Sequence, residues 1–394
     1  MLKLRRALVL AADPVNGSEQ SLRVQLAGER EAERAAIGDV SLVGPAEAGD
    51  EVIVNVQALD LGLGSGGFDV VHVNVSKGLA GEGTEGAAVM KLNYTSLQHA
   101  VVPVERESLR LPLERPVAVL GLHGQLAPLA WAFARAAPES RLGYVQSEGG
   151  ALPGGHSRTV RELRERELLA GHITAGAAFG GEEEAMTTAG AIHHGLCELS
   201  WDAVVCGPGP GIVGSRSALG HGGISALDSA HAALALGCRT LLVARMSSAD
   251  PRGRHRGISH HTLTVLDLLL EPVTVALPAG MRSPFGSDLL ADRRAANLRS
   301  AGLSAADASS ANADGATGAA RPALEVERPA RITRHDWRPA RVDLPAFAGS
   351  GLEAQTMGRG VLEDPLFFGA ALAGGEALAE LLAAAPRAAP RMNA

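Results

Sequence analysis

The chain has 394 residues and a formal net charge of −7, with 46% hydrophobic and 20% charged residues. This length is too great for one ordinary domain and favours two or three. An acidic chain is a poor general partner for nucleic acid, because such binding depends on cations placed against phosphates. The sequence also lacks a run of about 18 apolar residues, so no membrane span is predicted.

The first residues and the cysteines both favour a cytoplasmic protein. The apolar stretch 7–12 is short for a signal peptide and charged Asp13 follows it at once, so we expect a first strand there. The cysteines lack the CxxC spacing of zinc and redox sites. Cys197, Cys206 and Cys238 are therefore expected to be small buried residues of a protein that is kept reduced.

Residues 1–112 are predicted to form a small β domain. Short segments rich in Val and Leu are separated by Gly, Asp and Pro, which is typical of strands joined by turns. Several such strands in a domain of this size favour a barrel-like fold. The expected strands cover residues 6–12, 21–28, 50–59 and 69–75.

Residues 113–280 change to alternating strands and helices. This pattern predicts an α/β domain, a Rossmann-like three-layer sandwich whose doubly wound, mostly parallel sheet carries helices on both faces. The expected strands are 116–122, 141–146, 172–179, 202–207, 239–246 and 272–277, and the expected helices include 126–137, 157–169, 183–199 and 226–237. Glu182, Glu183 and Glu184 are expected at a helix start, where negative charge is favourable.

The remaining residues divide into two segments. Residues 281–327 include a stretch with few large apolar residues and many Ala, Ser, Gly and Asp, which predicts a linker or an exposed insertion. In residues 328–394, Leu, Phe and Ala return at helical spacing. We expect this last segment to dock on the α/β domain.

Candidate functional residues follow five of the expected strands. Open parallel sheets bind ligands beyond the carboxyl ends of their strands, so these residues are expected at one edge. Most of the 13 histidines also lie between positions 123 and 261, which concentrates the residue best suited to proton transfer in this domain. The candidates are His123 after the first strand, Ser147, Glu148 and Gly149 after the second, the segment from Gly180 after the third, 207–217 after the fourth and 251–262 after the fifth.

The segment 209–214, GPGIVG, matches the pattern GxGxxG directly after a strand. Gly209, Gly211 and Gly214, with Ser215 beside them, would let backbone N–H groups approach a phosphate or carboxylate at a helix N-terminus. The next expected strand carries no acidic residue for a ribose, which disfavours nicotinamide binding. A structural turn is the alternative explanation.

The segment 251–262, PRGRHRGISHHT, is unusually basic for this chain. Ser259 is a predicted N-cap, followed by His260 and His261 in the first helical turn. The positive end of the helix dipole should keep both histidines uncharged. Arg252, Arg254, Arg256 and His255 complete a set suited to an anion site with acid–base capability. The alternative is a surface loop whose arginines pair with local carboxylates.

These motifs resemble a bacterial domain-of-unknown-function family, number 3866. The similarity covers nearly the whole chain outside residues 298–322 and is carried by GDEVIVNVQALDLGLGSGGFDVV, MKLNYTSLQ, GLHGQ, GPGPGIVGS, HRGISHHT and TMGRGVLEDPLFF. Of these, HRGISHHT and TMGRG are the most specific. The resemblance implies a soluble bacterial protein, and it transfers no catalytic role because the family has no characterised activity.

The first functional hypothesis is an enzyme, a hydrolase or transferase, that acts on a small phosphorylated or carboxylated metabolite. The glycine segment 209–214 would cradle the anion, and the three arginines of 251–262 would hold it. His123, His255 or His260 would transfer protons, with Glu148 as a second acid–base group.

Two other hypotheses remain open. The same site could serve a non-catalytic sensor or binding module for a small anion or nucleotide. Alternatively, His123, His255, His260 and a carboxylate could bind a metal for a metal-dependent enzyme. The sequence names no cofactor, favours neither nucleic-acid nor membrane partners, and is compatible with a homo-oligomer.

Overall fold

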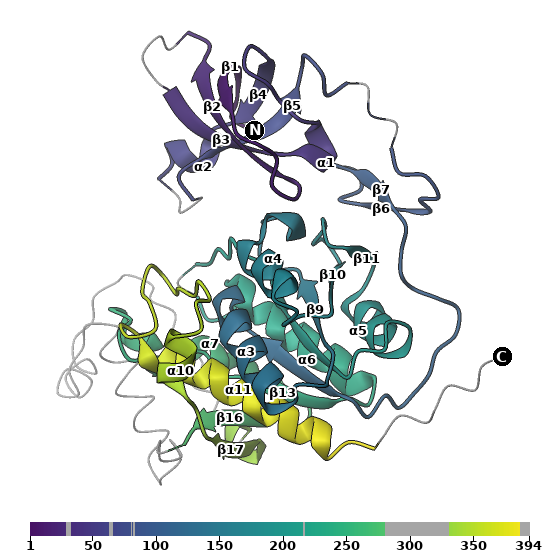
Figure 1. Ribbon diagram of the computed structural model, residues 1–394, viewed down its shortest axis with the longest axis vertical. Coiled ribbons are helices and arrows are strands. Elements are labelled where there is room, and N and C mark those ends of the chain that lie inside the picture. The colour runs from purple at the N-terminus through teal and green to yellow at the C-terminus, as the bar shows by residue number, and fades with distance from the viewer. Residues whose placement is uncertain are drawn as a thin grey trace, which may run out of the picture.

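The structure, a computed structural model, describes residues 1–28, 33–62, 66–79, 81, 83–215, 217–279 and 331–386. A β-barrel of N-terminal residues lies beside a larger part in which helices surround a parallel sheet (Figure 1). The predicted fold class is therefore confirmed. The predicted linker or insertion, residues 281–327, lies outside the described residues.

The barrel closes in the strand order β1-β2-β3-β5-β4. Alternate residues point inward, as in β4, where Val52 and Val54 are fully buried. β3 is not among the strands expected from the sequence, because its Glu, Arg and Gly residues do not favour strands. The barrel elements are β1 (Leu4–Ala12), β2 (Glu19–Leu26), β3 (Glu33–Asp39), α1 (Val40–Val43), β4 (Glu51–Asn55), α2 (Gln57–Asp60) and β5 (Asp69–Asn74).

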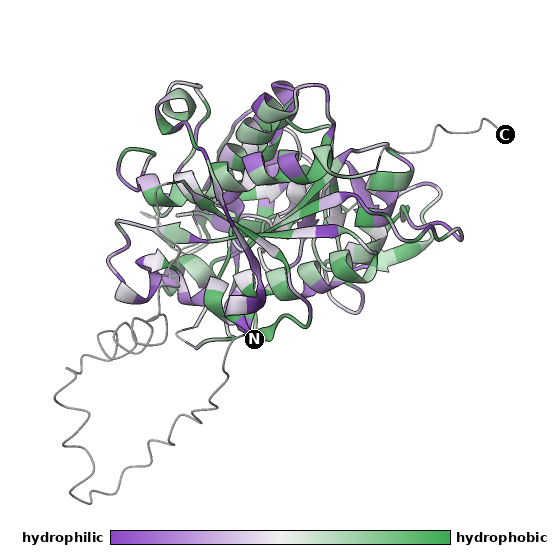
Figure 2. Ribbon diagram, turned by 90° about the horizontal axis from the view of Figure 1, so that it is seen from below, coloured by the Kyte–Doolittle hydropathy of each residue, from purple (hydrophilic) through white to green (hydrophobic). Residues whose placement is uncertain are grey.

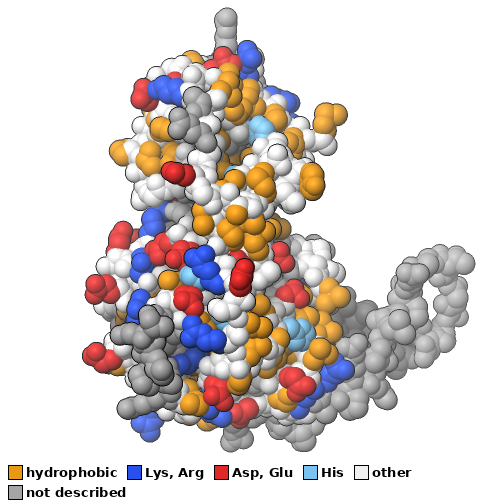
Figure 3. All heavy atoms as spheres, turned by 90° about the vertical axis from the view of Figure 1, so that its right-hand side faces the viewer, with side chains coloured by type: hydrophobic (Ala, Val, Ile, Leu, Met, Phe, Trp, Pro, Cys, Tyr) orange, Lys and Arg blue, Asp and Glu red, His pale blue; other side chains and the backbone are white. Residues whose placement is uncertain are grey.

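A short hairpin of β6 (Val89–Lys91) and β7 (His99–Val101) follows the barrel and contacts the α/β part. The buried ammonium group of Lys91 donates to the carbonyls of Thr174 and Ala178 and pairs with Glu184 at 2.6 Å. Exposed hydrophobic side chains gather where the barrel meets the α/β part (Figure 3). Met90 of the hairpin is also exposed.

The sheet of the α/β part has eight strands in the order β11-β10-β9-β12-β8-β13-β16-β17, and every neighbouring pair is parallel. All six expected strands are present. The expectation of a helix start at Glu182, Glu183 and Glu184 was wrong, because Glu183 and Glu184 form strand β11 instead. The strands are β8 (Pro116–Leu120), β9 (Leu142–Ser147), β10 (Gly171–Ala175), β11 (Glu183–Ala185), β12 (Ala203–Pro208), β13 (Arg239–Val243), β16 (Thr274–Pro278) and β17 (Asp336–Ala340).

Helices cover both faces of the sheet. One face packs against α3 (Leu126–Ala136), α4 (Arg158–Glu165) and α11 (Pro365–Ala383), with α10 (Leu344–Ala348) beside them. The other face packs against α5 (Thr188–Cys197), α6 (Ser225–Ala235) and α7 (His260–Leu268). Hydrophobic strands lie at the centre of these layers (Figure 2).

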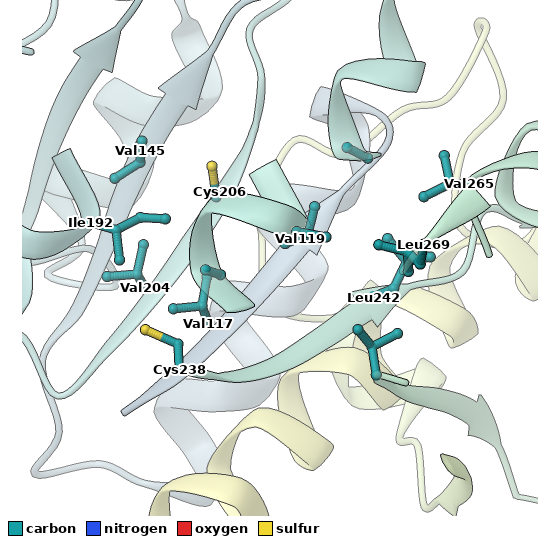
Figure 4. Packing of buried hydrophobic residues seen from close by; sticks show 14 of the residues in the cluster. Val117, Val119, Val145, Ile192, Val204, Cys206, Cys238, Leu242, Val265 and Leu269 are labelled. Atoms are coloured by element: carbon teal, nitrogen blue, oxygen red, sulfur yellow. The ribbon is translucent and has the colours of Figure 1, made fainter. Parts of the chain in front are cut away.

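The central strand β8 shows how the sequence builds both cores. All five of its residues are buried, as expected for a parallel strand covered on both faces. Val117 and Val119 point to the core under α5, α6 and α7 (Figure 4), whereas Ala118 and Leu120 point to the core under α3 and α11. The three cysteines are buried, as predicted.

α11 is the one helix among the described residues that is long and apolar enough to cross a membrane. Most of it is buried within the protein, against α3 and the sheet. Gly375 packs so closely that a Cβ there would come within 2.3 Å of the Leu129 carbonyl oxygen. The apolar composition of α11 is thus explained by its place inside the α/β layers, where the C-terminal residues also supply strand β17.

Candidate functional site

The candidate site lies at the carboxyl edge of the sheet, where the chain changes direction. β8 leads into α3 on one face, whereas its neighbours β12 and β13 lead into α6 and α7 on the other. A doubly wound sheet binds ligands in the crevice at such a switch point. The loops 209–224 and 244–259 both reach this place.

Residues 251–259 of the basic segment form the second half of the connection between β13 and α7. We call this connection, residues 244–259, the excursion. Two short strands, β14 (Met246–Ser247) and β15 (Gly257–Ile258), pair antiparallel, and the 3₁₀ helix η4 (Gly253–His255) lies between them. Ser259 then caps α7 by accepting the backbone N–H of His261, which confirms the predicted N-cap.

Asp250 holds this excursion together. Its carboxylate is fully buried and accepts hydrogen bonds from Arg252 through the backbone N–H, Nε at 2.9 Å and Nη2 at 2.8 Å. Buried Arg245 also approaches it at 3.3 Å. Arg252 is therefore engaged within the protein, whereas Arg254 and Arg256 use only their Nε atoms in hydrogen bonds to described residues.

Four histidines pack together beside Asp250 and its arginines. The ring centroids of His221 and His261 are 3.9 Å apart and stacked, and those of His260 and His261 are 4.0 Å apart. His255 lies 4.9 Å from His260 and 5.1 Å from His261. We call these four residues the histidine cluster. The structure thus brings together three predicted residues and adds His221 from the loop after β12.

All four rings are uncharged near neutral pH. Burial, helped by the charge on Arg254, lowers the pKa of His260 to about 4. Burial lowers the pKa of His221 to about 4, that of His255 to about 3 and that of His261 to about 2. The predicted loss of charge on His260 and His261 is confirmed, but burial is its largest cause.

The ring nitrogens of the cluster have different surroundings. His255 has Nδ1 2.8 Å from Ser259 Oγ, and its Nε2 accepts the Nε–H of Arg254 at 3.3 Å. Nε2 of His260 and Nδ1 of His261 are buried without a hydrogen-bond partner among the described residues. Two nitrogens inside the cluster are therefore available to a ligand.

The last residue of β9 and the residues after it line the same edge without joining the cluster. Ser147 is buried and donates to the carbonyl of Glu148 at 3.2 Å, and Glu148 itself is exposed. Gly149 packs against the loop 209–224, since a Cβ on it would come within 2.4 Å of the Gly222 carbonyl oxygen. This glycine serves the contact between two loops.

The GPGIVG segment does not open a helix. A Cβ on Gly209 would meet the Gln146 side chain at 2.3 Å, and one on Gly214 would meet the His221 ring at 2.4 Å. α6 begins only at Ser225, after a longer loop that ends in the 3₁₀ helix η3 (Gly222–Ile224). The expected anion cradle at a helix N-terminus is therefore not formed, and these glycines allow close loop packing.

The rest of this loop forms an exposed turn. Gly211 has a φ of +81°, in the region that favours glycine. The Ser215 hydroxyl lies 2.7 Å from that of Ser217 and 3.1 Å from the Gly220 carbonyl oxygen. Ser215 is therefore engaged in the turn.

His123, at the start of the 3₁₀ helix η1 (His123–Gln125), lies apart from the histidine cluster. Its Nε2 is 2.9 Å from Ser157 Oγ and its Nδ1 is 3.3 Å from the Tyr144 hydroxyl. No hydrogen bond or ring contact joins it to the cluster among the described residues. His123 is not among the histidines whose ring nitrogens converge, so the structure does not bring it into the predicted metal set or within reach of His260 for a shared proton transfer.

Five residues of this edge were not singled out from the sequence: His221, Arg245, Asp250, Arg359 and Asp364. Arg359 pairs with buried Asp364 at 3.1 Å and lies 3.9 Å from Asp250, which ties the C-terminal segment to the excursion. The specific motif TMGRG, which contains Arg359, was the available signal for this contact. Asp250 and Arg245 carried no motif of their own.

A cavity of about 20 Å³ borders His221, His261 and Arg245. This is about the volume that one water molecule requires. Two larger hollows, of about 270 and 220 Å³, lie on the barrel and at the amino edge of the sheet, and neither is lined by cluster residues. The cavity beside the cluster is therefore too small to enclose a metabolite.

Comparison with known proteins gives a family and no activity. A family model described as protein of unknown function (DUF3866) matches residues 35–375. No curated protein and no solved structure matches the chain significantly.

Proposed function

The chain belongs to the family described as protein of unknown function (DUF3866), and we propose that it is an enzyme that acts on a small anionic metabolite. The substrate would be phosphorylated or carboxylated, and the reaction would be a hydrolysis or a group transfer. One observation supports this most: uncharged histidines lie beside the partly unused guanidinium group of Arg254, with that of Arg256 on the same loop, at the switch point of a doubly wound sheet.

Three groups would recognise the anion. Arg254 and Arg256 each have Nη groups that make no hydrogen bond to described residues, and guanidinium groups bind phosphate and carboxylate well. His221 Nδ1 accepts the backbone N–H of Gly223 at 3.0 Å. In the neutral ring the proton is then on Nε2, which makes His221 an additional donor.

The histidines would bind and orient the substrate more than they would move protons. A general base works best with a pKa near the working pH, whereas burial lowers the pKa of His255 to about 3 and that of His260 to about 4. Exposed Glu148, after β9, is the remaining acid–base candidate at this edge.

Ligand-induced thermal shifts test this proposal. Wild-type protein is screened against phosphorylated and carboxylated metabolites, with inorganic phosphate and pyrophosphate as simple probes. We expect Arg256→Ala to bind the best anion at least about tenfold more weakly, because it removes a charge-assisted contact. Arg239→Ala, which removes the same charge at the amino edge of the sheet, should bind like the wild type.

The same samples separate an enzyme from a sensor. Conversion of the bound metabolite, followed by NMR, would support the enzyme. Binding without conversion would instead favour a non-catalytic sensor of the same anion. Equal shifts in Arg256→Ala and the wild type would place the ligand elsewhere and overturn the site.

A further inference from the structure

We propose that His255, His260 and His261 bind a divalent transition metal of the zinc class. This inference goes beyond the proposed function, because metal binding requires no substrate. It also differs from the metal set expected from the sequence, since His261 takes part and His123 does not.

The three imidazoles converge from two elements. One nitrogen from each residue lies within 4.8 Å of the others, with His255 from η4 and the other two from the first turn of α7. Three nitrogens bound to one zinc ion at 2.0–2.1 Å are roughly 3.3 Å apart. Small side-chain rotations that draw the rings inward would therefore complete the site.

The orientation of His255 is fixed by its neighbours. Arginine only donates hydrogen bonds, so the contact from Arg254 Nε requires an unprotonated Nε2 on His255. In the neutral ring the proton is then on Nδ1, which donates to Ser259 Oγ at 2.8 Å. A metal-binding histidine commonly has its second nitrogen held in this way, with the lone pair of the other nitrogen directed at the metal.

The other two ligands are supplied by buried nitrogens that lack a partner. Nε2 of His260 and Nδ1 of His261 make no hydrogen bond to described residues, and burying a polar atom without a partner is unfavourable. A metal ion that accepts both lone pairs removes this penalty. The side chain of His261 is more than nine-tenths buried, so bulk water is largely kept away from it.

The positive charge around the cluster is partly offset by one buried carboxylate. Arg245 and Arg252 lie close to the cluster, but both pair with the carboxylate of Asp250, at 3.3 and 2.8 Å. Asp250 thereby offsets part of the positive charge that would oppose a metal ion. Arg254 is the remaining neighbour, and it now occupies the His255 nitrogen that the metal would take.

The donor set identifies the class of metal. Imidazole nitrogens suit zinc, copper, nickel and iron, whereas magnesium and calcium require oxygen ligands. Three protein ligands leave a coordination position open, as in catalytic zinc sites. A metal on His255 would also displace Arg254, whose whole guanidinium group could then bind an anion beside the metal.

Metal titration of the full chain tests the proposal without any substrate. Chelator-treated protein is titrated with Zn²⁺ by calorimetry and with Co²⁺ by visible absorption, and bound metal is counted by mass spectrometry. We expect one equivalent, a tetrahedral Co²⁺ spectrum, and no competition from Mg²⁺. His260→Ala should bind at least about 100-fold more weakly, whereas His72→Ala in barrel strand β5 should bind like the wild type.

Circular dichroism and thermal unfolding show whether His260→Ala is folded, and His261→Gln provides a second variant if it is not. Wild-type affinity in folded His260→Ala or His261→Gln would overturn the metal site, as would the absence of a tetrahedral Co²⁺ spectrum. Phosphate titration of the metal-free protein reports on the anion site alone. Failure of metal binding is therefore distinguishable from failure of the proposed function.

Discussion

Arg252 and Arg254 are two residues apart in a basic segment, and their contacts give them different roles. Arg252 makes a bidentate pair with buried Asp250, so removing it would leave that carboxylate short of a partner. Arg254 contacts only a histidine nitrogen among the described residues. At the scale of single residues, the candidates for ligand binding are therefore the side chains whose polar atoms make few hydrogen bonds to described residues.

A prediction at this scale concerns His172, a buried histidine outside the cluster. It stacks on Tyr144 with centroids 5.2 Å apart, and its Nε2 lies 3.2 Å from Gln146 Oε1. Burial, with the nearby charges of His123 and Arg164, lowers the pKa of His172 to about 3. A histidine in the unfolded chain has a pKa of about 6.5.

Below about pH 6.5 the unfolded chain binds a proton at His172 and the folded chain does not. The free energy of unfolding therefore decreases as the pH is lowered. This group contributes about 1.4 kcal/mol per pH unit until its folded pKa is reached. We expect His172→Gln to show a shallower decrease between pH 6 and pH 4.5 in urea unfolding. Parallel curves for variant and wild type would refute this contribution.

At the scale of elements, the excursion between β13 and α7 depends on one carboxylate more than on its two short strands. β14 and β15 have two residues each, whereas Asp250 binds three groups of Arg252 and pairs with buried Arg245. The cluster histidine on η4 is positioned by this arrangement. The stability of the excursion should therefore depend on Asp250.

We expect Asp250→Ala to lower the free energy of unfolding by about 3–5 kcal/mol, because it leaves the buried charge of Arg245 without its partner. Asp336→Ala is the matched control, since it removes an exposed pair with Arg338 that should contribute about 1 kcal/mol or less. Urea unfolding of both variants provides the comparison. Similar losses in the two would show that the Asp250 network does not hold the excursion.

At the scale of the whole molecule, the barrel and the β6–β7 hairpin that follows it are joined to the α/β part by buried polar contacts. Lys91 reaches two carbonyl groups and Glu184 at the edge of the sheet, and His156 lies 3.2 Å from Asp39 of the barrel. Both contacts are at the carboxyl edge, near β9 and β10. The barrel is therefore held on the same side of the sheet as the candidate site.

We expect Lys91→Met to loosen this junction, because it removes two carbonyl contacts and an ion pair while keeping a long apolar stem. Limited proteolysis with thermolysin should cut residues 75–115 faster in the variant, with the α/β part left intact. Lys77→Met, which removes an exposed ammonium group from the same region, should be cut like the wild type. Equal cutting in all three proteins would rule out Lys91 as the anchor.

The fold class could be predicted because hydrophobic spacing is local information. The strands near residues 116–122 and 202–207 are continuous apolar runs, and a buried parallel strand requires them. β3 and β11 were missed because their sequences are polar and they are held in place by neighbouring strands. Ser259 was predicted correctly as an N-cap because capping also depends on nearby residues.

The sequence by itself determined the barrel, the doubly wound sheet and the chemical character of the segment 251–262. Tertiary structure alone decided which candidate side chains can bind a ligand and which are engaged by other parts of the protein. Asp250 engages Arg252, His221 arrives from a separate loop, and His123 is held by Ser157. The physical reason is that a polar atom is satisfied by whichever group folding brings within about 3 Å, and that partner need not be near in the sequence.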